Sequence, residues 1–377
     1  MRLSGLAALT IALAACGGSD STSPQPQVGS IVVATPTTGH DLDSDGYSIT
    51  VDEHSARPVA ANDSVRIDSV LAGSHSITLS DYAGNCHADT TRVTVDVTVG
   101  MATRASFHLG CVPTRLHDRI VYSTGIDEHA RLISIDPDGS DPERITWDQL
   151  DYLHPSVSAD GRQIAFLSLP SDVIGIMNAD GTGVRLLPTP RNFDGNPVWS
   201  PDGSALAFRS ELPGPYGDYG RIFVINADGT GLRQVSPETA DFTYDDSPSW
   251  SPDGSRILFS RNGQGYTVNV DGTGLHSLGT ECQYGAWSPD GSRVACTATV
   301  SANMDVYLVS ADGTNSFRLT TYADQDEGAR WSPDGTRLVF MRLIDGHFQL
   351  VRINSDGTGE VQLTNTTSHT NSPWWAW

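Results

Sequence analysis

The sequence predicts an all-β protein in which a small antiparallel β-sandwich is followed by a six-bladed β-propeller. The main observation is an internal repeat in residues 113–377, where Trp-Ser-Pro-Asp-Gly occurs four times and a second Asp-Gly turn recurs about every 43 residues. A repeat of this length that contains four short apolar runs is typical of a propeller blade. The chain also contains 37 Gly and 21 Pro, which favours many short elements joined by tight turns.

The N-terminus is predicted to be an export signal. One Arg precedes an apolar run that ends at Leu13, and this run is too short to span a membrane, which takes about 20 residues. The segment that ends at Cys16 resembles the lipobox of bacterial lipoproteins. The resemblance implies a signal peptide at residues 1–15, lipidation of Cys16 and anchoring to a membrane. Gly17 stands where an Asp would retain a lipoprotein at the inner membrane, so the outer membrane is expected, facing the periplasm or the cell surface. Residues 16–27 are predicted to form a flexible tether.

Residues 28–112 are predicted to form the sandwich. Short runs with alternating apolar residues and many β-branched side chains are separated by Gly, Asp and Asn, as expected for strands of an immunoglobulin-like sandwich. Cys86 and Cys111 are the only cysteines of this region, and an exported protein folds where disulfides form, so we expect them to pair. Residues 29–33, 43–47 and 72–79 resemble the PEGA-like sandwiches of bacterial lipoproteins, which implies a spacer or adhesive module.

An acidic segment in this region has two interpretations. Asp41, Asp43 and Asp45 alternate before Gly46, and Asp52 stands at the twelfth place of a calcium-loop spacing. A strand pattern follows where such a loop needs a helix, which favours a solvated turn over a calcium site.

Each copy of the repeat predicts four strands. The innermost strand ends at the Trp, and Ser-Pro-Asp-Gly forms the next turn because Pro fixes φ and Gly accepts a positive φ. The Trp side chains are expected to pack between neighbouring sheets rather than to bind a ligand. The first copy lacks an innermost strand, whereas residues 371–377 repeat the end of one. The C-terminal strand is therefore predicted to complete the first blade of a propeller that spans residues 113–377.

The repeats resemble the TolB-type propeller repeats over about 260 of the 377 residues. The resemblance implies the propeller fold, whereas function differs among relatives, which include binding proteins, lyases and the gates of peptidases. The chain differs from TolB itself in its lipobox and in an N-terminal region that is predicted to be all-β, where TolB has an α/β domain.

Sequence motifs for chemistry are absent. The chain has no Gly-x-Ser-x-Gly, no His-Glu-x-x-His and no Lys for a phosphate-binding loop, so no cofactor, metal or catalytic residue is expected. A net charge of −22 makes nucleic acid an unsuitable partner. Cys282 and Cys296 lie in one copy of the repeat, either as a local disulfide or as buried free thiols.

The candidate ligand site is a ring at one mouth of the propeller channel. Polar residues at the start of the innermost strands are predicted to surround it. They are His154, Asp194, Asn196, Asp245, Asp246, Asp326, Glu327 and Asn371. Such an acidic ring favours cations, basic peptides or metal-bridged sugars, while the alternative is that these side chains cap turns and face solvent.

The function that these observations favour is that of a non-catalytic lipoprotein of the cell envelope, which binds a protein, peptide or glycan partner through its propeller. The alternative is a metal-assisted polysaccharide lyase or hydrolase at the acidic mouth. That chemistry needs several convergent imidazoles, and only His154 and His369 are placed near the ring. A third possibility is a purely structural surface protein without a selective ligand.

Overall fold

The computed structural model describes residues 26–125, 129–189, 194–213, 219–238, 243–300 and 303–376. The predicted signal peptide and Cys16 lie outside these residues. Every element in the described residues is a strand, which confirms the predicted all-β class. In the same residues there is no helix with the length and apolar character needed to cross a membrane.

The chain divides into two compact units. The first consists of Met1–Pro36, Tyr47–Ser80 and Thr90–Phe107, and the second consists of Thr37–Gly46, Asp81–Asp89 and His108–Trp377.

Two sheets form the first unit. One has the order β5-β1-β9 and the other the order β4-β3-β6-β8. Their strands are β1 (Val28–Ala34), β3 (Tyr47–Val51), β4 (Arg57–Val59), β5 (Ser64–Leu71), β6 (Gly73–Ser80), β8 (Arg92–Val97) and β9 (Ala102–Ser106). Alternate residues are buried, among them Ile31 and Val33 on β1 and Ile77 and Leu79 on β6. This alternation is the pattern of sheets that cover a core with one face.

A three-stranded sheet of the second unit comes from the region that the sequence assigned to the sandwich. Its strands are β2 (Thr37–Gly39), β10 (Leu109–Cys111) and β7 (Cys86–Ala88), in the order β2-β10-β7. Cys86 and Cys111 are directly opposite in the register of β7 and β10 and form a disulfide. The predicted disulfide is therefore confirmed.

The rest of the second unit, within the described residues, forms six four-stranded sheets. The innermost strands are β34 (Thr370–Trp375), β14 (Asp151–Val157), β18 (Asp194–Trp199), β22 (Asp245–Trp250), β26 (Gln283–Trp287) and β30 (Asp326–Trp331). The second strands are β11 (Ile120–Thr124), β15 (Gln163–Leu169), β19 (Ala205–Leu212), β23 (Arg256–Arg261), β27 (Arg293–Val300) and β31 (Arg337–Ile344). The third strands are β12 (Arg131–Ile135), β16 (Val173–Asn178), β20 (Tyr219–Asn226), β24 (Gln264–Asn269), β28 (Asn303–Ser310) and β32 (His347–Asn354). The outer strands are β13 (Glu143–Arg144), β17 (Arg185–Leu186), β21 (Arg233–Gln234), β25 (His276–Glu281), β29 (Ser316–Arg318) and β33 (Val361–Gln362).

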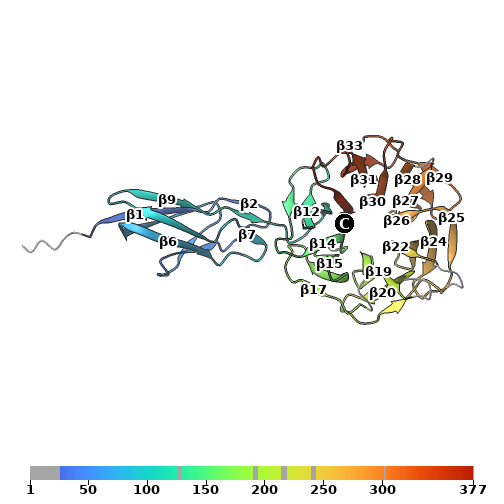
Figure 1. Ribbon diagram of the computed structural model, residues 1–377, viewed down its shortest axis with the longest axis horizontal. Helices are drawn as coiled ribbons and strands as arrows, with labels where there is room; N and C mark the ends of the chain where they lie inside the picture. The colour runs from blue at the N-terminus through green and yellow to red at the C-terminus, as the bar shows by residue number, and fades with distance from the viewer. Residues whose placement is uncertain are drawn as a thin grey trace, which may run out of the picture. The chain divides into compact units, whose positions relative to one another are not determined.

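The six sheets are arranged in a ring (Figure 1). Each innermost strand contacts the innermost strand of the next sheet, and β34 contacts both β30 and β14. β34 also pairs antiparallel with β11, where Trp375 is opposite Ile120. One sheet is thus built from both ends of this part of the chain.

The repeated turn fixes the register between the first two strands of a sheet. In one copy Ser251 donates a hydrogen bond through Oγ to Oδ1 of Asp253 at 2.6 Å, and the same oxygen accepts the N–H of Ser255 at 3.0 Å. These hydrogen bonds lower the pKa of Asp253 to about 2. Gly254 has a φ of 69°, which other residues rarely adopt.

The Trp residues that end the innermost strands pack between sheets. Trp199, for example, belongs to a buried cluster with Leu167 from the preceding sheet and Phe208 from its own sheet. A further disulfide joins Cys282 and Cys296, which settles the two alternatives left by the sequence. The Trp packing places the core between the sheets. Side chains of the innermost strands that do not belong to this core can face the channel.

We expect Trp375→Ala to lower the free energy of unfolding of the second unit by about 3 to 5 kcal/mol. Trp375 is 1% exposed and its indole N–H donates to Asp118 at 3.2 Å, so the variant loses packing at the closing sheet. Denaturant unfolding followed by circular dichroism measures the change. Phe317, which is 52% exposed, provides the control, since Phe317→Ala should change stability by less than about 1 kcal/mol. Equal stabilities of the two variants would contradict the role given to the closing strand.

Candidate functional site

A β-bulge at the same place in each innermost strand builds the candidate site. In all six sheets the pairing of the first two strands shifts register near the middle of the innermost strand. At this point one residue of each strand has a positive φ. These residues are His154, Asn196, Ser247, Tyr284, Gly328 and Ser372. A left-handed conformation costs a residue other than Gly about 1 to 2 kcal/mol, and bulges of this kind often redirect a side chain beside a functional site.

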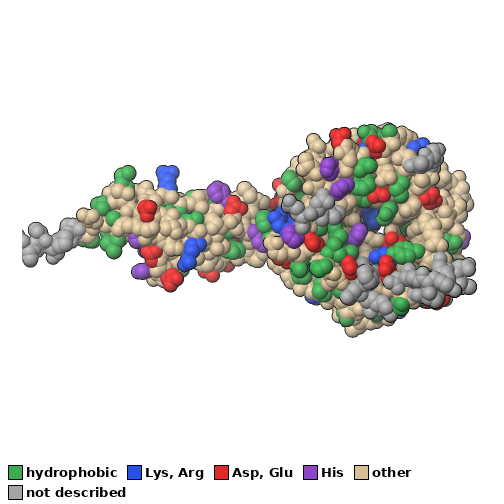
Figure 2. Space-filling model, viewed as in Figure 1, with side chains coloured by type: hydrophobic (Ala, Val, Ile, Leu, Met, Phe, Trp, Pro, Cys, Tyr) green, Lys and Arg blue, Asp and Glu red, His purple; other side chains and the backbone are tan. Residues whose placement is uncertain are grey.

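The six bulge residues line one cavity in the channel. Its volume is about 240 Å³, and Glu327, Arg330 and Asn371 also line it. In the space-filling view the surface is hollowed at the centre of the ring, where acidic, basic, histidine and apolar side chains meet (Figure 2). Six repeats therefore place six polar or small residues, of five different types, around one space.

Four of the predicted site residues, His154, Asn196, Glu327 and Asn371, line this cavity. Asp246 lies beside it, because its Oδ1 accepts a hydrogen bond from Nδ2 of Asn196 at 2.8 Å. Asp194 begins β18, and its side chain lies outside the described residues.

Asp245 and Asp326 are placed differently from the other predicted residues. Both are completely buried, and neither is among the residues that line the cavity. Asp245 accepts two hydrogen bonds from Arg261, at 2.6 and 2.7 Å, and Asp326 accepts two from Arg342, at 2.7 and 2.9 Å. Each carboxylate is thus neutralised by an Arg at the opposite register position of the second strand.

The electrostatics of the cavity are mixed rather than uniformly acidic. Burial lowers the pKa of His154 to about 4, so its imidazole is neutral at pH 7, and Nδ1 lies 2.8 Å from Oγ of Ser372. Burial also raises the pKa of Glu327. The guanidinium of Arg330 adds a positive charge in the channel, which the sequence interpretation did not anticipate.

Ser247, Ser372 and Arg330 are among the lining residues that the sequence interpretation missed. Ser247 and Ser372 precede a Pro inside an innermost strand, as His154 and Asn196 do. Pro lacks the N–H that a strand interior needs, so a Pro at the same place in four copies was a signal for the bulge.

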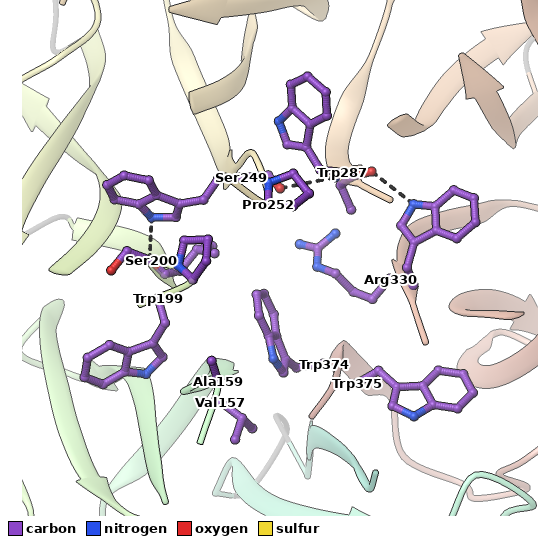
Figure 3. Close-up of a pocket in the computed structure, with 15 residues that line it drawn as sticks. Val157, Ala159, Trp199, Ser200, Ser249, Pro252, Trp287, Arg330, Trp374 and Trp375 are labelled. Atoms are coloured by element: carbon purple, nitrogen blue, oxygen red, sulfur yellow. Dashed lines mark hydrogen bonds between the residues drawn. The ribbon is translucent and has the colours of Figure 1, made fainter. Parts of the chain in front are cut away.

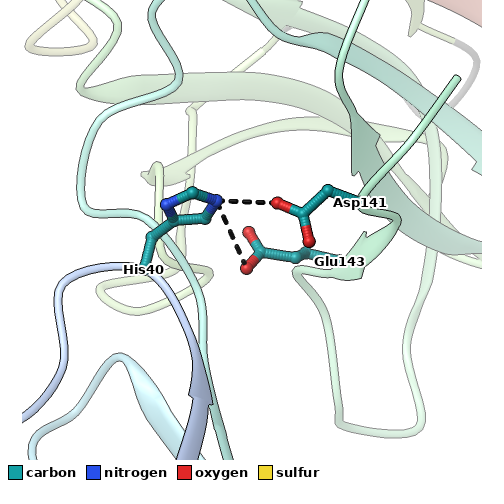
Figure 4. Close-up of side chains that lie close together, drawn as sticks. All are labelled: His40, Asp141 and Glu143. Carbon is teal, nitrogen blue, oxygen red and sulfur yellow. Dashed lines mark hydrogen bonds and ion pairs between the residues drawn. The ribbon is translucent and has the colours of Figure 1, made fainter. Parts of the chain in front are cut away.

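A separate cluster of possible metal ligands lies outside the channel cavities. Within the described residues, His40, Asp141 and Glu143 are the one group of three whose ligand atoms lie within 4.8 Å of one another. Nε2 of His40 is 2.7 Å from Oδ2 of Asp141 and 3.9 Å from Oε1 of Glu143 (Figure 4). Arg119 already faces both carboxylates, at 3.3 Å from Asp141 and 3.7 Å from Glu143. His40, Asp141 and Glu143 therefore form an ion-pair cluster in which Arg119 is the cation.

The acidic segment considered for calcium is not assembled into a ligand group in the described part of the chain. Asp41 accepts hydrogen bonds from the N–H and the hydroxyl of Thr114, at 2.8 and 2.6 Å. Asp52 belongs to the first unit, whereas Asp43 and Asp45 belong to the second. Asp52 lies 2.5 Å from Nδ1 of His75. These contacts agree with the turn interpretation.

The ring of four-stranded sheets around a lined channel defines the protein as a β-propeller with a channel-mouth cavity. The chain belongs to the TolB β-propeller family, since the family model PD40, described as TolB beta propeller domain, matches residues 109–376.

Solved structures agree with this fold. TolB from Acinetobacter baumannii is 20% identical with a TM-score of 0.60, and the match covers 70% of this chain and 68% of that one. A putative TolB from Agrobacterium tumefaciens is 18% identical with a TM-score of 0.53, covering 66% and 89%. An oligogalacturonate lyase in complex with manganese is 16% identical with a TM-score of 0.46, covering 60% and 74%, and this likeness is too distant to bear on function.

We expect Asp326→Ala to lower the free energy of unfolding by about 3 to 5 kcal/mol, because Arg342 would keep a buried charge without its main partner. Asp324, two residues earlier, is exposed, so Asp324→Ala removes the same charge without that effect. Urea unfolding of both variants tests the assignment. If Asp326→Ala were as stable as the control, Asp326 would be available for a ligand after all.

The stability of the second unit should depend on pH through His154. The folded pKa of His154 is about 4, whereas an unfolded His titrates near about 6.5. The unfolded chain therefore binds more protons between these values, and stability falls as the pH decreases through this window. Between pH 7 and pH 5 this contribution is about 1 to 2 kcal/mol.

His154→Asn removes the titrating group and keeps a residue that the equivalent bulge at Asn196 already carries. Unfolding at pH 7 and pH 5 should show a smaller loss of stability in this variant than in the parent chain. His276→Gln, at an exposed position, should keep the parental loss. A variant at His154 with the full parental pH dependence would show that His154 titrates normally.

Proposed function

We propose that this protein is a non-catalytic lipoprotein of the cell envelope, which binds a protein, peptide or glycan partner at the channel mouth formed by the six bulge residues. Lipidation at Cys16 would anchor it, with the outer membrane as the expected location. Membership of the TolB β-propeller family supports a place in the envelope and, among the three classes of partner, favours a protein.

The observation that carries this proposal is the ring of bulge residues. Five residues other than Gly adopt a left-handed conformation at equivalent positions, and all of them line the same cavity. Backbone strain of this kind is concentrated at functional sites, where the surrounding structure maintains it. Because the six sheets contribute five different residue types, the ring presents a specific pattern of donors and acceptors instead of a uniform surface.

A binding role fits these side chains better than a catalytic one. His154 is the one imidazole among the residues that line the cavity in the described chain, so the convergent His set of a metal-assisted lyase has no counterpart there. The hydrogen bond from Asn196 holds Asp246 at the edge of the cavity. The groups present can orient a polar ligand, and partner specificity follows from their arrangement.

Affinity capture from envelope extracts tests the proposal. The bait is the chain itself, compared with a double variant, Asp246→Asn with Glu327→Gln, which keeps side-chain size and removes two charges at the cavity. The control, Asp324→Asn with Asp345→Asn, removes two exposed charges. We expect a partner that the parent and the control retain and that the cavity variant loses by at least about tenfold, equivalent to roughly 1.4 kcal/mol. Equal recovery with all three baits would place the partner site elsewhere on the chain.

A further inference from the structure

Two innermost strands carry large side chains where their counterparts carry small ones. The residue directly before the Trp position is Ser156, Val198, Ser249 or Ala286 in four strands, but Arg330 in β30 and Trp374 in β34. Successive side chains of a strand point to opposite sides. In five of the six strands the residue at this preceding position lines a cavity of the channel. The fold therefore accepts a small residue here and does not itself require Arg330 or Trp374.

These two side chains lie in a second cavity of the channel. It has a volume of about 340 Å³ and is lined by the Trp residues of the innermost strands, by Pro201 and Pro252, and by Arg330. The Trp residues that end the innermost strands and line this cavity are called the Trp ring. Figure 3 shows the guanidinium of Arg330 and the indole of Trp374 reaching into the centre of the Trp ring. The residues that line this cavity come from the ends of the innermost strands, whereas the bulge residues come from their middle.

Arg330 is the one charged side chain among the described residues that line this cavity. Its Nη1 donates to the carbonyl oxygens of Tyr284 at 3.1 Å and Ala329 at 3.0 Å, and its guanidinium lies 5.9 Å from the ring centre of Trp374. No carboxylate of the described chain forms an ion pair with Arg330. Arg261, in contrast, pairs with Asp245.

The missing counter-charge indicates the chemistry of a ligand. Burial lowers the pKa of Arg330 to about 10, so the group remains a cation at pH 7, and a cation removed from water is costly unless an anion faces it. The planar guanidinium matches a carboxylate, which can accept two of its N–H groups. The surrounding Trp and Pro side chains provide an apolar wall but only this single charge.

We propose that this cavity binds the free C-terminus of a peptide with an apolar last residue. The terminal carboxylate pairs with Arg330, and the apolar side chain packs against Trp374 and the Trp ring. A cavity of about 340 Å³ is at the small end of ligand sites and holds one or two residues. This cavity shares Val198 and Arg330 with the cavity at the bulge residues, but the proposal does not depend on the function proposed for that ring.

Calorimetric titration of the full chain tests the proposal. The probe is N-acetyl-Ala-Leu as the free acid, compared with the same dipeptide as its C-terminal amide and with decanoate. We expect the free acid to bind at least tenfold more tightly than the amide and than decanoate. Equal binding of acid and amide, or no saturable binding of the acid up to millimolar concentration, would overturn the proposal. Tighter binding of decanoate would overturn the assignment to a peptide.

Variants connect this binding to Arg330. Arg330→Ser introduces the residue that Ser249 supplies in another sheet, so the fold accepts it, and it should abolish the preference for the acid over the amide. Arg330→Lys should restore part of that preference, and Arg162→Ser, at an exposed position, should leave it unchanged. Without peptide, Arg330→Ser should melt at or above the parental temperature, because an unpaired buried charge is removed. A lower melting temperature together with unchanged peptide binding would show that Arg330 is structural.

Discussion

The closure of the ring by β34 is the constraint on which the channel depends. Both candidate cavities are lined by innermost strands, and these strands surround a common space only because β34 pairs with β11 and contacts β30 and β14. Trp375 ties this strand to the interface between two sheets. Hydrogen bonding between β34 and β11 completes this sheet. Each of the six innermost strands therefore pairs with the second strand of its own sheet. The same closure holds the six bulges at one level, so local strain in each strand contributes to a single cavity.

The bulges show how a repeat produces a site that is not itself repetitive. The backbone deviation is the same in each innermost strand, whereas the residue at that point is of five different types among the six sheets. In four of the six copies the cost of the left-handed residue is met by shared interactions, namely the Ser-Pro-Asp-Gly turn and the Trp packed between sheets. At Gly328 an added Cβ would lie 2.8 Å from the methyl carbon of Met341, so this member of the ring contributes space instead of a polar group.

The fold could be predicted from the sequence much further than the site. The repeat predicted the all-β class and the TolB-like propeller, and the Cys86 to Cys111 disulfide followed from composition and export. The site was harder, because whether an Asp at the start of a strand faces the channel depends on a distant residue. Asp326 turns away since Arg342 stands opposite it in the next strand. The sequence contains that Arg, but only the strand register shows that the two meet.

Arg330 was missed for a different physical reason. It directly precedes a motif, Trp-Ser-Pro-Asp-Gly, whose residues are structural, and in a chain with a net charge of −22 one Arg does not change the overall field. A charge in a narrow, partly desolvated channel nevertheless acts mainly on what enters that channel, because interactions there are screened less than on the surface. Net charge therefore describes which partners approach the protein, while the single guanidinium decides which chemical group is stable inside it. The two cavities share only Val198 and Arg330 among their lining residues, so ligand recognition at the bulge ring and at the Trp ring can differ within one channel.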